Sequence, residues 1–278
     1  MSKSIVDHAL EALLYEVVTE PKPGLVDPNN NGSHSDMDVY TFINSSVALR
    51  EYFEQASQLG ESFTGNDLIE MFASLREKGI QAEKAMFAAT NNVNTHKGAI
   101  FSLGIFTCAQ SYAGVHQQNV YEVIRQMCKG LVAHDMKDKE KTNKTIGEQI
   151  YFKYGYAGAR ELAESGYPVV EKTTLPFLEK STGTINQRLL DTLIKTASVI
   201  ADTTFIKRSG GMDQLPWLKK VCRQYFDLGG SKTAEGIEYL REMNTIFVEH
   251  NYTLGGCADI LIVTIFMALE KDSLSFKN

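Results

Sequence analysis

Residues 5–20 read IVDHALEALLYEVVTE, and this stretch indicates the fold class. Its apolar residues recur three and four positions apart, which is the period of an α-helix with one buried face. Pro21 follows directly, and the residue before a proline is disfavoured in helical geometry. The sequence therefore predicts an amphipathic N-terminal helix that ends by Glu20, at the start of a proline-rich loop.

The same helical period recurs along the rest of the chain, between polar segments rich in turn-forming residues. No run of alternating apolar and polar residues and no hairpin signal appears. Further helices are expected over residues 36–49 (with Ser35 or Asp36 as N-cap), 65–89 (weakened at Gly79), 98–113, 119–132, 146–157, 159–165, 187–201, 214–226, 234–249 and 258–270. Residues 134–144 are mostly charged and are expected to form a solvated loop. The pattern predicts an all-α protein, with one compact multi-helix domain over residues 1–278 and its active site in the inter-helix loops.

Composition excludes several classes of protein. The 278 residues are 43% hydrophobic and 22% charged, as in globular domains, and the net charge of −6 argues against a nucleic-acid partner. Cys108, Cys128, Cys222 and Cys257 form no C-x-x-C pair, so we expect reduced core thiols in a cytoplasmic protein. We expect neither a signal peptide nor membrane association, because the apolar run 260–269 is shorter than the roughly 20 residues that span a bilayer.

Polar loops between helices are the natural place for a site in an all-α protein. The first such loop, residues 20–37, contains three of the six prolines, which fix its backbone. Lys22 supplies a cation, while Glu20, Asp27 and Asp36 offer the oxygen ligands that Mg²⁺ prefers. A rigid surface turn, in which Asp36 caps the next helix, would explain the same residues.

Three further positions combine a cation with a helix end or with glycines. Residues 91–98 read NNVNTHKG and open an apolar helix, whose free N–H groups attract phosphate, and Lys97 adds positive charge there. Arg160 follows Gly158, and Arg208 precedes two glycines, so either guanidinium is suited to grip a phosphate. Ordinary helix ends with solvated cations would explain the same patterns.

The last of these segments, residues 255–259, reads GGCAD and opens the final helix. Asp259 precedes a strongly apolar stretch, so its carboxylate is expected to meet little solvent. Taken together, the loops suit a polyphosphate with Mg²⁺, because carboxylates hold the metal while cations and helix ends hold phosphate oxygens. The residues alone do not choose between hydrolysis, phosphoryl transfer and glycosyl transfer.

Five motifs, spread over about residues 10–270, resemble the triphosphoribosyl-dephospho-CoA synthase family. They are PKPGLVD (21–27), NGSHSDM (31–37), VNTHKG (93–98), GAR (158–160) with GYP (166–168), and GGCAD (255–259). The resemblance implies that ATP and 3′-dephospho-CoA yield 2′-(5″-triphosphoribosyl)-3′-dephospho-CoA and adenine, so that ATP donates a ribosyl group. Breaking the bond from ribose to adenine develops oxocarbenium-like charge, which a nearby carboxylate stabilises.

On this basis we assign expected roles to the loop residues. The catalytic candidates are Glu20, His34, Asp36 and His96; the substrate and phosphate contacts are Lys22, Asn94, Thr95, Lys97, Gly98, Arg160, Arg208, Gly255 and Gly256; the Mg²⁺ ligands are Asp27, Asp36 and Asp259. The product is expected to pass to an acyl-carrier-protein holo-transferase serving citrate lyase. The alternatives are a malonate decarboxylase branch of the same chemistry, a Mg²⁺-dependent helical nucleotide hydrolase and a nucleotide-sensing module. A homodimer is compatible with the sequence.

Overall fold

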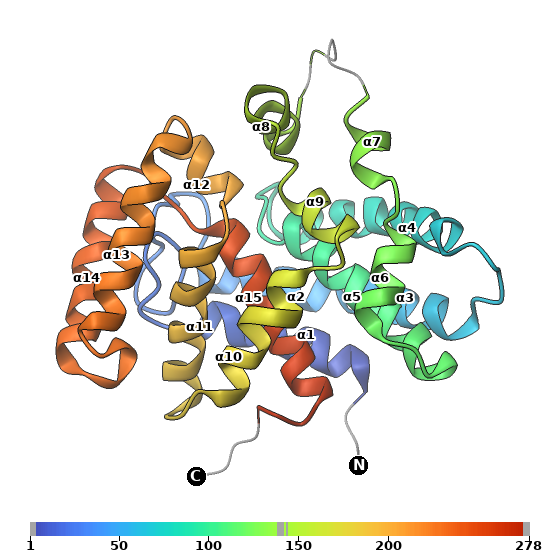
Figure 1. The fold of residues 1–278 in the computed structure, drawn as a ribbon, viewed down its shortest axis with the longest axis horizontal. Coiled ribbons are helices and arrows are strands. Elements are labelled where there is room, and N and C mark those ends of the chain that lie inside the picture. The colour runs from blue at the N-terminus through green and yellow to red at the C-terminus, as the bar shows by residue number, and fades with distance from the viewer. Residues whose placement is uncertain (1–3, 138–141, 143, 275–278) are drawn as a thin grey trace.

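The structure is a computed structural model, and it describes residues 4–137, 142 and 144–274. Within those residues the chain is helical and contains no strand, so the predicted all-α class is confirmed (Figure 1). In chain order the α-helices are α1 (Ile5–Val18), α2 (Val39–Ala48), α3 (Arg50–Ser62), α4 (Leu68–Ala89), α5 (Lys97–His116), α6 (Val120–Met127), α7 (Leu131–Asp135), α8 (Ile146–Tyr154), α9 (Ala159–Glu164), α10 (Leu175–Lys180), α11 (Ile185–Val199), α12 (Thr203–Arg208), α13 (Leu215–Asp227), α14 (Ala234–Glu249) and α15 (Gly255–Glu270). Short π- or 3₁₀-helical turns cover Val170–Thr174, Met212–Gln214 and Gly230–Lys232.

Two apolar helices, α5 and α15, form the centre of the fold. Most residues of both are buried, and the two helices pack against each other. Helix α5 also lies against α3, α4 and α6, and α15 lies against α1, α10 and α11. In Figure 1, α13 and α14 lie on one side of α15, and α3, α4 and α6 lie on the other. Helix α5 is long and apolar enough to span a membrane, but its burial among four helices accounts for that composition.

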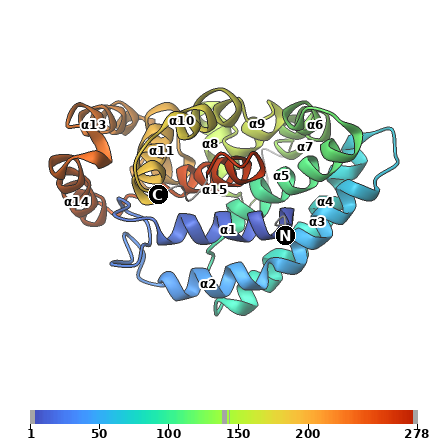
Figure 2. The same cartoon turned by 90° about the horizontal axis from the view of Figure 1, so that it is seen from below.

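The predicted N-terminal helix is α1, and its start and end follow from local sequence. Ser4 and Asp7 form a capping box at its start, and it ends at Val18, ahead of Pro21 as expected. Figure 2 shows α1 and α2 side by side below the central helices. The proline-rich loop then packs on the far end of the molecule, where the Gly24 amide donates to Asn244 Oδ1 at 2.9 Å.

Two predicted helix boundaries were wrong because the chain uses other caps and breaks. Helix α2 begins at Val39, since Asp38 rather than Ser35 or Asp36 accepts the capping bond from the Thr41 amide at 2.8 Å. The helix expected over residues 119–132 ends at Met127, and Gly130, with a φ of 76°, starts α7 in a new direction. By contrast, α4 runs unbroken through Gly79.

Three segments form helices that the sequence analysis missed: α3, α10 with the π-helical turn before it, and α12. The helix expected over residues 36–49 stops at Leu49, where the chain continues into α3 without a side-chain cap to mark the new start. The loop expected over residues 134–144 begins inside α7, and residues 138–141 and 143 lie outside the described part of the chain.

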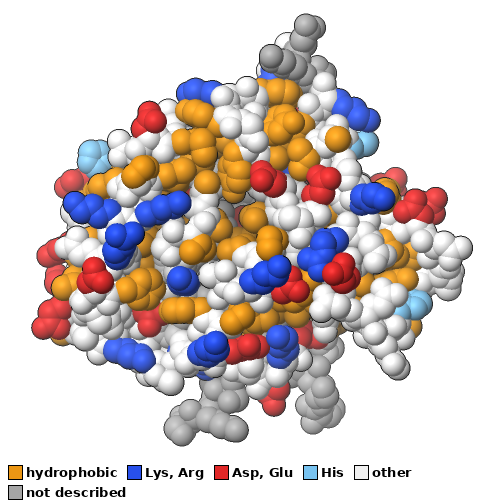
Figure 3. Space-filling view, viewed as in Figure 1, with side chains coloured by type: hydrophobic (Ala, Val, Ile, Leu, Met, Phe, Trp, Pro, Cys, Tyr) orange, Lys and Arg blue, Asp and Glu red, His pale blue; other side chains and the backbone are white. Residues whose placement is uncertain are grey.

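The surface and the thiols agree with the composition. On the face shown in Figure 3, Lys and Arg alternate with Asp and Glu, and no broad basic surface appears. All four cysteines are buried and unpaired. The interior is therefore held by helix packing without disulfides.

Candidate active site

The cavity that gathers most of the predicted site residues has a volume of about 710 Å³, within the range of small-molecule sites. It is enclosed by the C-terminal end of α1, the loop before α2, the start of α5, helix α12 and the start of α15. Its lining residues are Glu16, Leu25, Val26, Ser33, His34, Ser35, Asp36, Met37, Phe42, Asn94, Thr95, His96, Lys97, Gly98, Thr204, Lys207, Arg208, Asn251, Thr253, Gly255, Ala258, Asp259 and Ile262.

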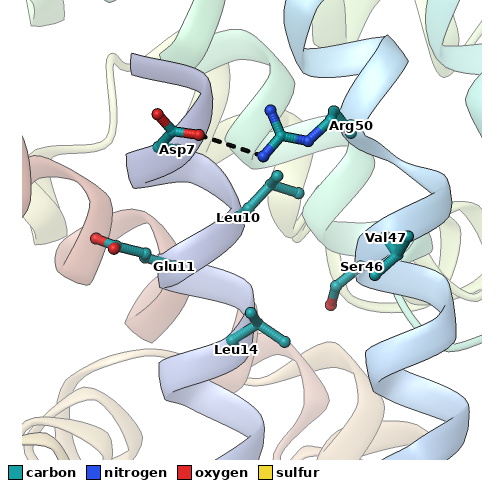
Figure 4. Close-up of a pocket in the computed structure, with 7 residues that line it drawn as sticks. All are labelled: Asp7, Leu10, Glu11, Leu14, Ser46, Val47 and Arg50. Atoms are coloured by element: carbon teal, nitrogen blue, oxygen red, sulfur yellow. Dashed lines mark hydrogen bonds and ion pairs between the residues drawn. The ribbon is translucent and has the colours of Figure 1, made fainter. Parts of the chain in front are cut away.

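A second cavity, of about 410 Å³, lies between α1 and α2 (Figure 4). Leu10 and Leu14 point across it from α1, and an ion pair of 3.2 Å joins Asp7 to Arg50 beside it. None of the predicted site residues lines this cavity. The cavity at the starts of α5 and α15 is therefore the candidate active site.

The N-termini of α5 and α15 both open into the candidate site. Neither helix has a side-chain cap on its N-cap residue, His96 or Leu254. In the described chain, no acceptor contacts the backbone amides of Gly98, Ala99 or Gly256. At the start of α15, however, the Gly255 and Cys257 amides already donate to Thr204 Oγ1 at 3.0 Å and to Asp202 Oδ2 at 2.7 Å. Because free amides carry the positive end of the helix dipole, the start of α5 is the helix end suited to an anion such as a triphosphate.

Asp259 is the unpaired carboxylate of the cavity wall. No described residue forms a hydrogen bond or an ion pair with it. It lies directly against Gly98 at the start of α5, where any side chain on Gly98 would collide with the carboxylate. Burial raises the pKa of Asp259 well above its usual value, and the neighbouring Asp202 and Glu16 raise it further. Asp259 is partly exposed to the cavity, and a carboxylate in this state would be strongly stabilised by a bound cation.

Lys22 does not reach the cavity, contrary to its predicted role in phosphate binding. Its side chain is fully buried, and its ammonium pairs with Glu16 Oε1 at 2.6 Å. Glu16, which does line the cavity, is itself 3% exposed. A lysine held by a buried carboxylate in this way supports the floor of the site and is not available to a ligand.

His34 and Arg208 join the proline-rich loop to α12 at the cavity. The Arg208 guanidinium donates to Ser33 O at 2.8 Å and to Asn251 Oδ1 at 2.7 Å, and it lies 3.4 Å from His34 Nδ1. His34 Nε2 lies 3.2 Å from Thr253 Oγ1. Burial and the positive charge of Arg208 lower the pKa of His34, so this imidazole is neutral near pH 7.

His96 is buried at the start of α5 and lines the cavity. Its Nδ1 lies 2.7 Å from the Ser45 hydroxyl, and its Nε2 has no hydrogen-bond partner in the described structure. Burial, together with the nearby Lys22, lowers the pKa of His96 to about 3. The ring is therefore neutral, as its predicted part in catalysis or ligand contact requires.

The remaining members of the VNTHKG motif lie at the rim. Asn94 Oδ1 accepts a bond from the Lys97 amide at 3.3 Å, and Thr95 donates to Ser45 Oγ at 2.8 Å. The Lys97 ammonium is half exposed and pairs with Glu83 at 2.6 Å. This exposed pair leaves Lys97 free to turn toward an anion in the cavity.

Besides Lys22 and Gly256, three predicted site residues do not line the cavity. Asp27 is consumed by the loop itself, since its oxygens accept from the amides of Lys22, Asn29 and Asn30 at 2.9 to 3.1 Å. Glu20 accepts from the Asn29 side chain. Arg160 donates through Nε to Asp135 at 2.6 Å, and Arg76 donates to the same carboxylate oxygen.

The predicted trio of metal ligands is not assembled. Asp36 and Asp259 line the cavity but Asp27 does not, and within the described residues no cluster of three or more His, Cys, Asp or Glu side chains could hold a metal ion. Gly255 lines the cavity, whereas Gly256 faces the carboxylate of Asp202. Any metal bound here would therefore take some of its ligands from a bound phosphate.

The sequence analysis missed several lining residues, and for two of them a signal was present. Glu16 lies on the buried face of α1, between Leu13 and Val17, and a charge on an apolar stripe marks an unusual site. Lys207 directly precedes Arg208 and adds a second positive charge to this segment. Thr204, Asn251 and Thr253 carry no such signal, because only the folded chain brings them to the cavity.

Comparison with known proteins agrees with the motifs. Residues 2–277 match the protein family CitG, described as ATP:dephospho-CoA triphosphoribosyl transferase. The chain is 48% identical to a probable 2-(5″-triphosphoribosyl)-3′-dephosphocoenzyme-A synthase of Lactiplantibacillus plantarum, over 99% of both chains. It is 46% identical to the protein CitXG of Leuconostoc mesenteroides, over 97% of this chain but 60% of that protein. A protein of Vibrio cholerae with the same description as the first is 38% identical over 94% of this chain and 86% of its own length. No solved structure matches.

Proposed function

Because the chain belongs to the ATP:dephospho-CoA triphosphoribosyl transferase family and is therefore an enzyme of the transferase class, we propose that the cavity at the starts of α5 and α15 is its active site. The family acts on ATP and dephospho-CoA. The observation that carries the proposal is the contact of the start of α5, whose Gly98 and Ala99 amides have no acceptor in the described structure, with the unpaired Asp259, since a triphosphate with its cation needs both.

The triphosphate of ATP is held by the backbone amides at the start of α5 and by the cations of the rim. Lys97, Lys207 and Arg208 line the cavity, and they outnumber the unpaired carboxylates Asp36 and Asp259. Amides and cations restrain the phosphate chain but are not nucleophiles that cleave it, which suits a reaction that keeps the triphosphate intact.

The donor set also fits Mg²⁺. A magnesium ion bound with a nucleotide takes one or two carboxylates from the protein and the rest of its ligands from phosphate and water. Asp259 is the protein ligand, because it lines the cavity and has no hydrogen bond or ion pair in the described structure. The ion would neutralise phosphate charge there. Asp27, whose oxygens are occupied within its own loop, has no part in this set.

The transfer step breaks the bond from ribose C1′ to adenine N9 and forms a bond from C1′ to the 2′-oxygen of dephospho-CoA. Adenine departs with the electron pair of the broken bond, and the attacking hydroxyl loses its proton. Asp36, exposed at the mouth of the cavity, is the carboxylate placed to accept that proton. The buried walls keep water from C1′, so that the acceptor hydroxyl is favoured over hydrolysis.

We also assign the product to the prosthetic group of the citrate lyase acyl carrier protein, to which a holo-transferase would pass it. The names of the matching family and of the Leuconostoc relative fit this role. The four unpaired thiols fit a cytoplasmic enzyme. Supplying the product to the holo-transferases of citrate lyase and of malonate decarboxylase, and measuring loading of each carrier protein, separates the two branches.

Product analysis by mass spectrometry tests the reaction. With ATP, Mg²⁺ and dephospho-CoA, we expect adenine and an enlarged CoA species in equal amounts, and neither when dephospho-CoA is omitted. ADP, AMP or free phosphate would instead identify a hydrolase. Unchanged substrates would contradict catalysis of this transfer.

A further inference from the structure

A chain of two hydrogen bonds ends at the buried imidazole of His96. Thr95 Oγ1 donates to Ser45 Oγ at 2.8 Å, and Ser45 Oγ lies 2.7 Å from His96 Nδ1. Ser45 comes from α2 and is fully buried, whereas His96 is the N-cap residue of α5. The imidazole is therefore oriented by a residue from a different helix.

Counting protons along this chain assigns the tautomer of His96. A serine hydroxyl has a single proton, and the Thr95 bond already uses Ser45 as an acceptor. Among the described residues, His96 Nδ1 is the only acceptor in contact with the Ser45 proton. Nδ1 is thus the bare nitrogen, and the proton of the neutral ring resides on Nε2.

The Nε2–H group is left without an acceptor inside a protein wall. His96 is 2% exposed, and its Nε2 has no partner in the described structure. A buried donor in this state costs about 1–3 kcal/mol, which a ligand acceptor would recover. A ligand acceptor that satisfies this donor must displace part of the wall, because the Nε2 atom itself is covered.

The surroundings of His96 indicate which part of a ligand makes that contact. Phe42 packs edge to face with the imidazole, with 4.9 Å between ring centres. Val26, Met37 and Phe42 belong to a small apolar cluster that also contains Val17, and these three line the cavity beside His96. A flat, apolar wall with one neutral N–H donor suits a purine base, which has apolar faces and ring nitrogens that accept hydrogen bonds.

We propose that Ser45 is a positioning residue that fixes His96 as its Nε2–H tautomer. This N–H donates a hydrogen bond to a ring nitrogen of the adenine of ATP, and the adenine packs against the wall of Val26, Met37 and Phe42. The adenine assignment rests on the proposed function, whereas the tautomer does not. His96 then acts as a hydrogen-bond donor to the departing base and does not take the proton of the acceptor hydroxyl.

Nitrogen-15 NMR of the ligand-free, wild-type protein tests the tautomer without reference to activity. We expect the assigned His96 signals to show a protonated Nε2 and a bare Nδ1, and the same pattern in the Ser45→Thr variant. The Ser45→Ala variant should lose this fixed pattern. A protonated Nδ1 in the wild type would overturn the assignment even if the enzyme proves to be the expected transferase.

Variant kinetics test the donor role. His96→Gln keeps an N–H near the Nε2 position but cannot accept a proton as a base, so we expect it to retain activity within about tenfold, while His96→Ala loses about a hundredfold. Ser45→Ala should raise the KM for ATP about tenfold and leave that for dephospho-CoA unchanged, and Ser45→Thr should restore it. Equal loss in folded His96→Gln and His96→Ala would contradict the donor role.

Analogues of ATP test the adenine contact itself. Replacing ring nitrogens N1, N3 and N7 by carbon, one at a time, should raise the KM of the wild type about tenfold in one case. That analogue and ATP should behave alike in Ser45→Ala, because the contact is already lost there. If all three analogues match ATP in the wild type, the adenine assignment is wrong.

Discussion

The first half of the proline-rich loop, residues 20–30, and the walls of the cavity both carry signature acids, but they use them differently. In the loop, the oxygens of Asp27 accept backbone amides of the same loop, and Glu20 holds Asn29. In the cavity, Asp36 and Asp259 have no hydrogen bond or ion pair in the described structure. Acids of the first kind fold the chain, and acids of the second kind remain available to a ligand.

The largest effect on activity is expected when the cavity acid Asp259 is replaced by its amide. Asp259→Asn should lower kcat about a thousandfold, because it removes the carboxylate that meets the cation of ATP. It should leave the thermal unfolding temperature unchanged or higher, since an unpaired carboxyl whose charged form is disfavoured in the folded state is removed. Steady-state kinetics and calorimetry without Mg²⁺ measure the two effects.

The matched control is Asp27→Asn. We expect it to cost about 1–3 kcal/mol of unfolding free energy, because an amide cannot accept all the loop amides, while the folded fraction keeps its activity. The comparison between the two regions breaks down if Asp27→Asn is inactive at unchanged stability.

The next largest effect concerns the buried pair beneath the cavity. Lys22→Met should lower the free energy of unfolding by about 3–5 kcal/mol, because it leaves Glu16 charged and unpaired in the interior. Adding Glu16→Gln should recover much of this loss. Denaturant unfolding measures both variants, and loss of ATP binding at unchanged stability would instead restore Lys22 to the phosphate site.

Lys97 tests the rim of the cavity. Lys97→Ala should lower kcat/KM about thirtyfold without unfolding the protein, since it removes a charged contact to phosphate. Glu83→Gln breaks the same exposed ion pair but leaves the ammonium in place, so it should stay near wild type. Near-normal activity of Lys97→Ala would remove this residue from the site.

The pH dependence of the free energy of unfolding tests whether His96 is a buried, neutral ring in the cavity wall. His96 has a pKa of about 3 in the folded state, below its ordinary value of 6.5, so the unfolded chain binds more protons between these values. Stability is therefore full above pH 6.5 and falls as pH decreases, by about 1.4 kcal/mol per pH unit for this one group. His96→Gln should lack this component in unfolding experiments at pH 6.5 and 5.5, and equal slopes for both proteins would contradict a buried neutral ring.

The smallest effect is expected for Arg160. Arg160→Gln breaks a partly exposed pair with Asp135 outside the cavity, so kcat/KM should stay within about threefold and the free energy of unfolding should fall by about 1 kcal/mol or less. A hundredfold loss of activity would extend the active site to this second cluster.

The sequence predicted the helical class well because helix period is a local signal, as α1 and α14 show. It missed α3 and α12, whose starts and lengths depend on neighbours. For the candidate site, the structure brings His34, Asp36, His96, Lys97, Arg208 and Asp259, which the sequence patterns singled out, to one cavity. The sequence could not reveal that Lys22 and Asp27 are occupied, since their partners are set by how the loop folds back on α1.

A crystal structure with ATP and Mg²⁺, in the absence of dephospho-CoA, tests the central claim most directly. We predict that the triphosphate lies at the starts of α5 and α15, with phosphate oxygens bound to the amides of Gly98 and Ala99 and the metal on Asp259. A nucleotide bound elsewhere, such as against Arg76 and Arg160, would contradict the assignment of this cavity as the active site.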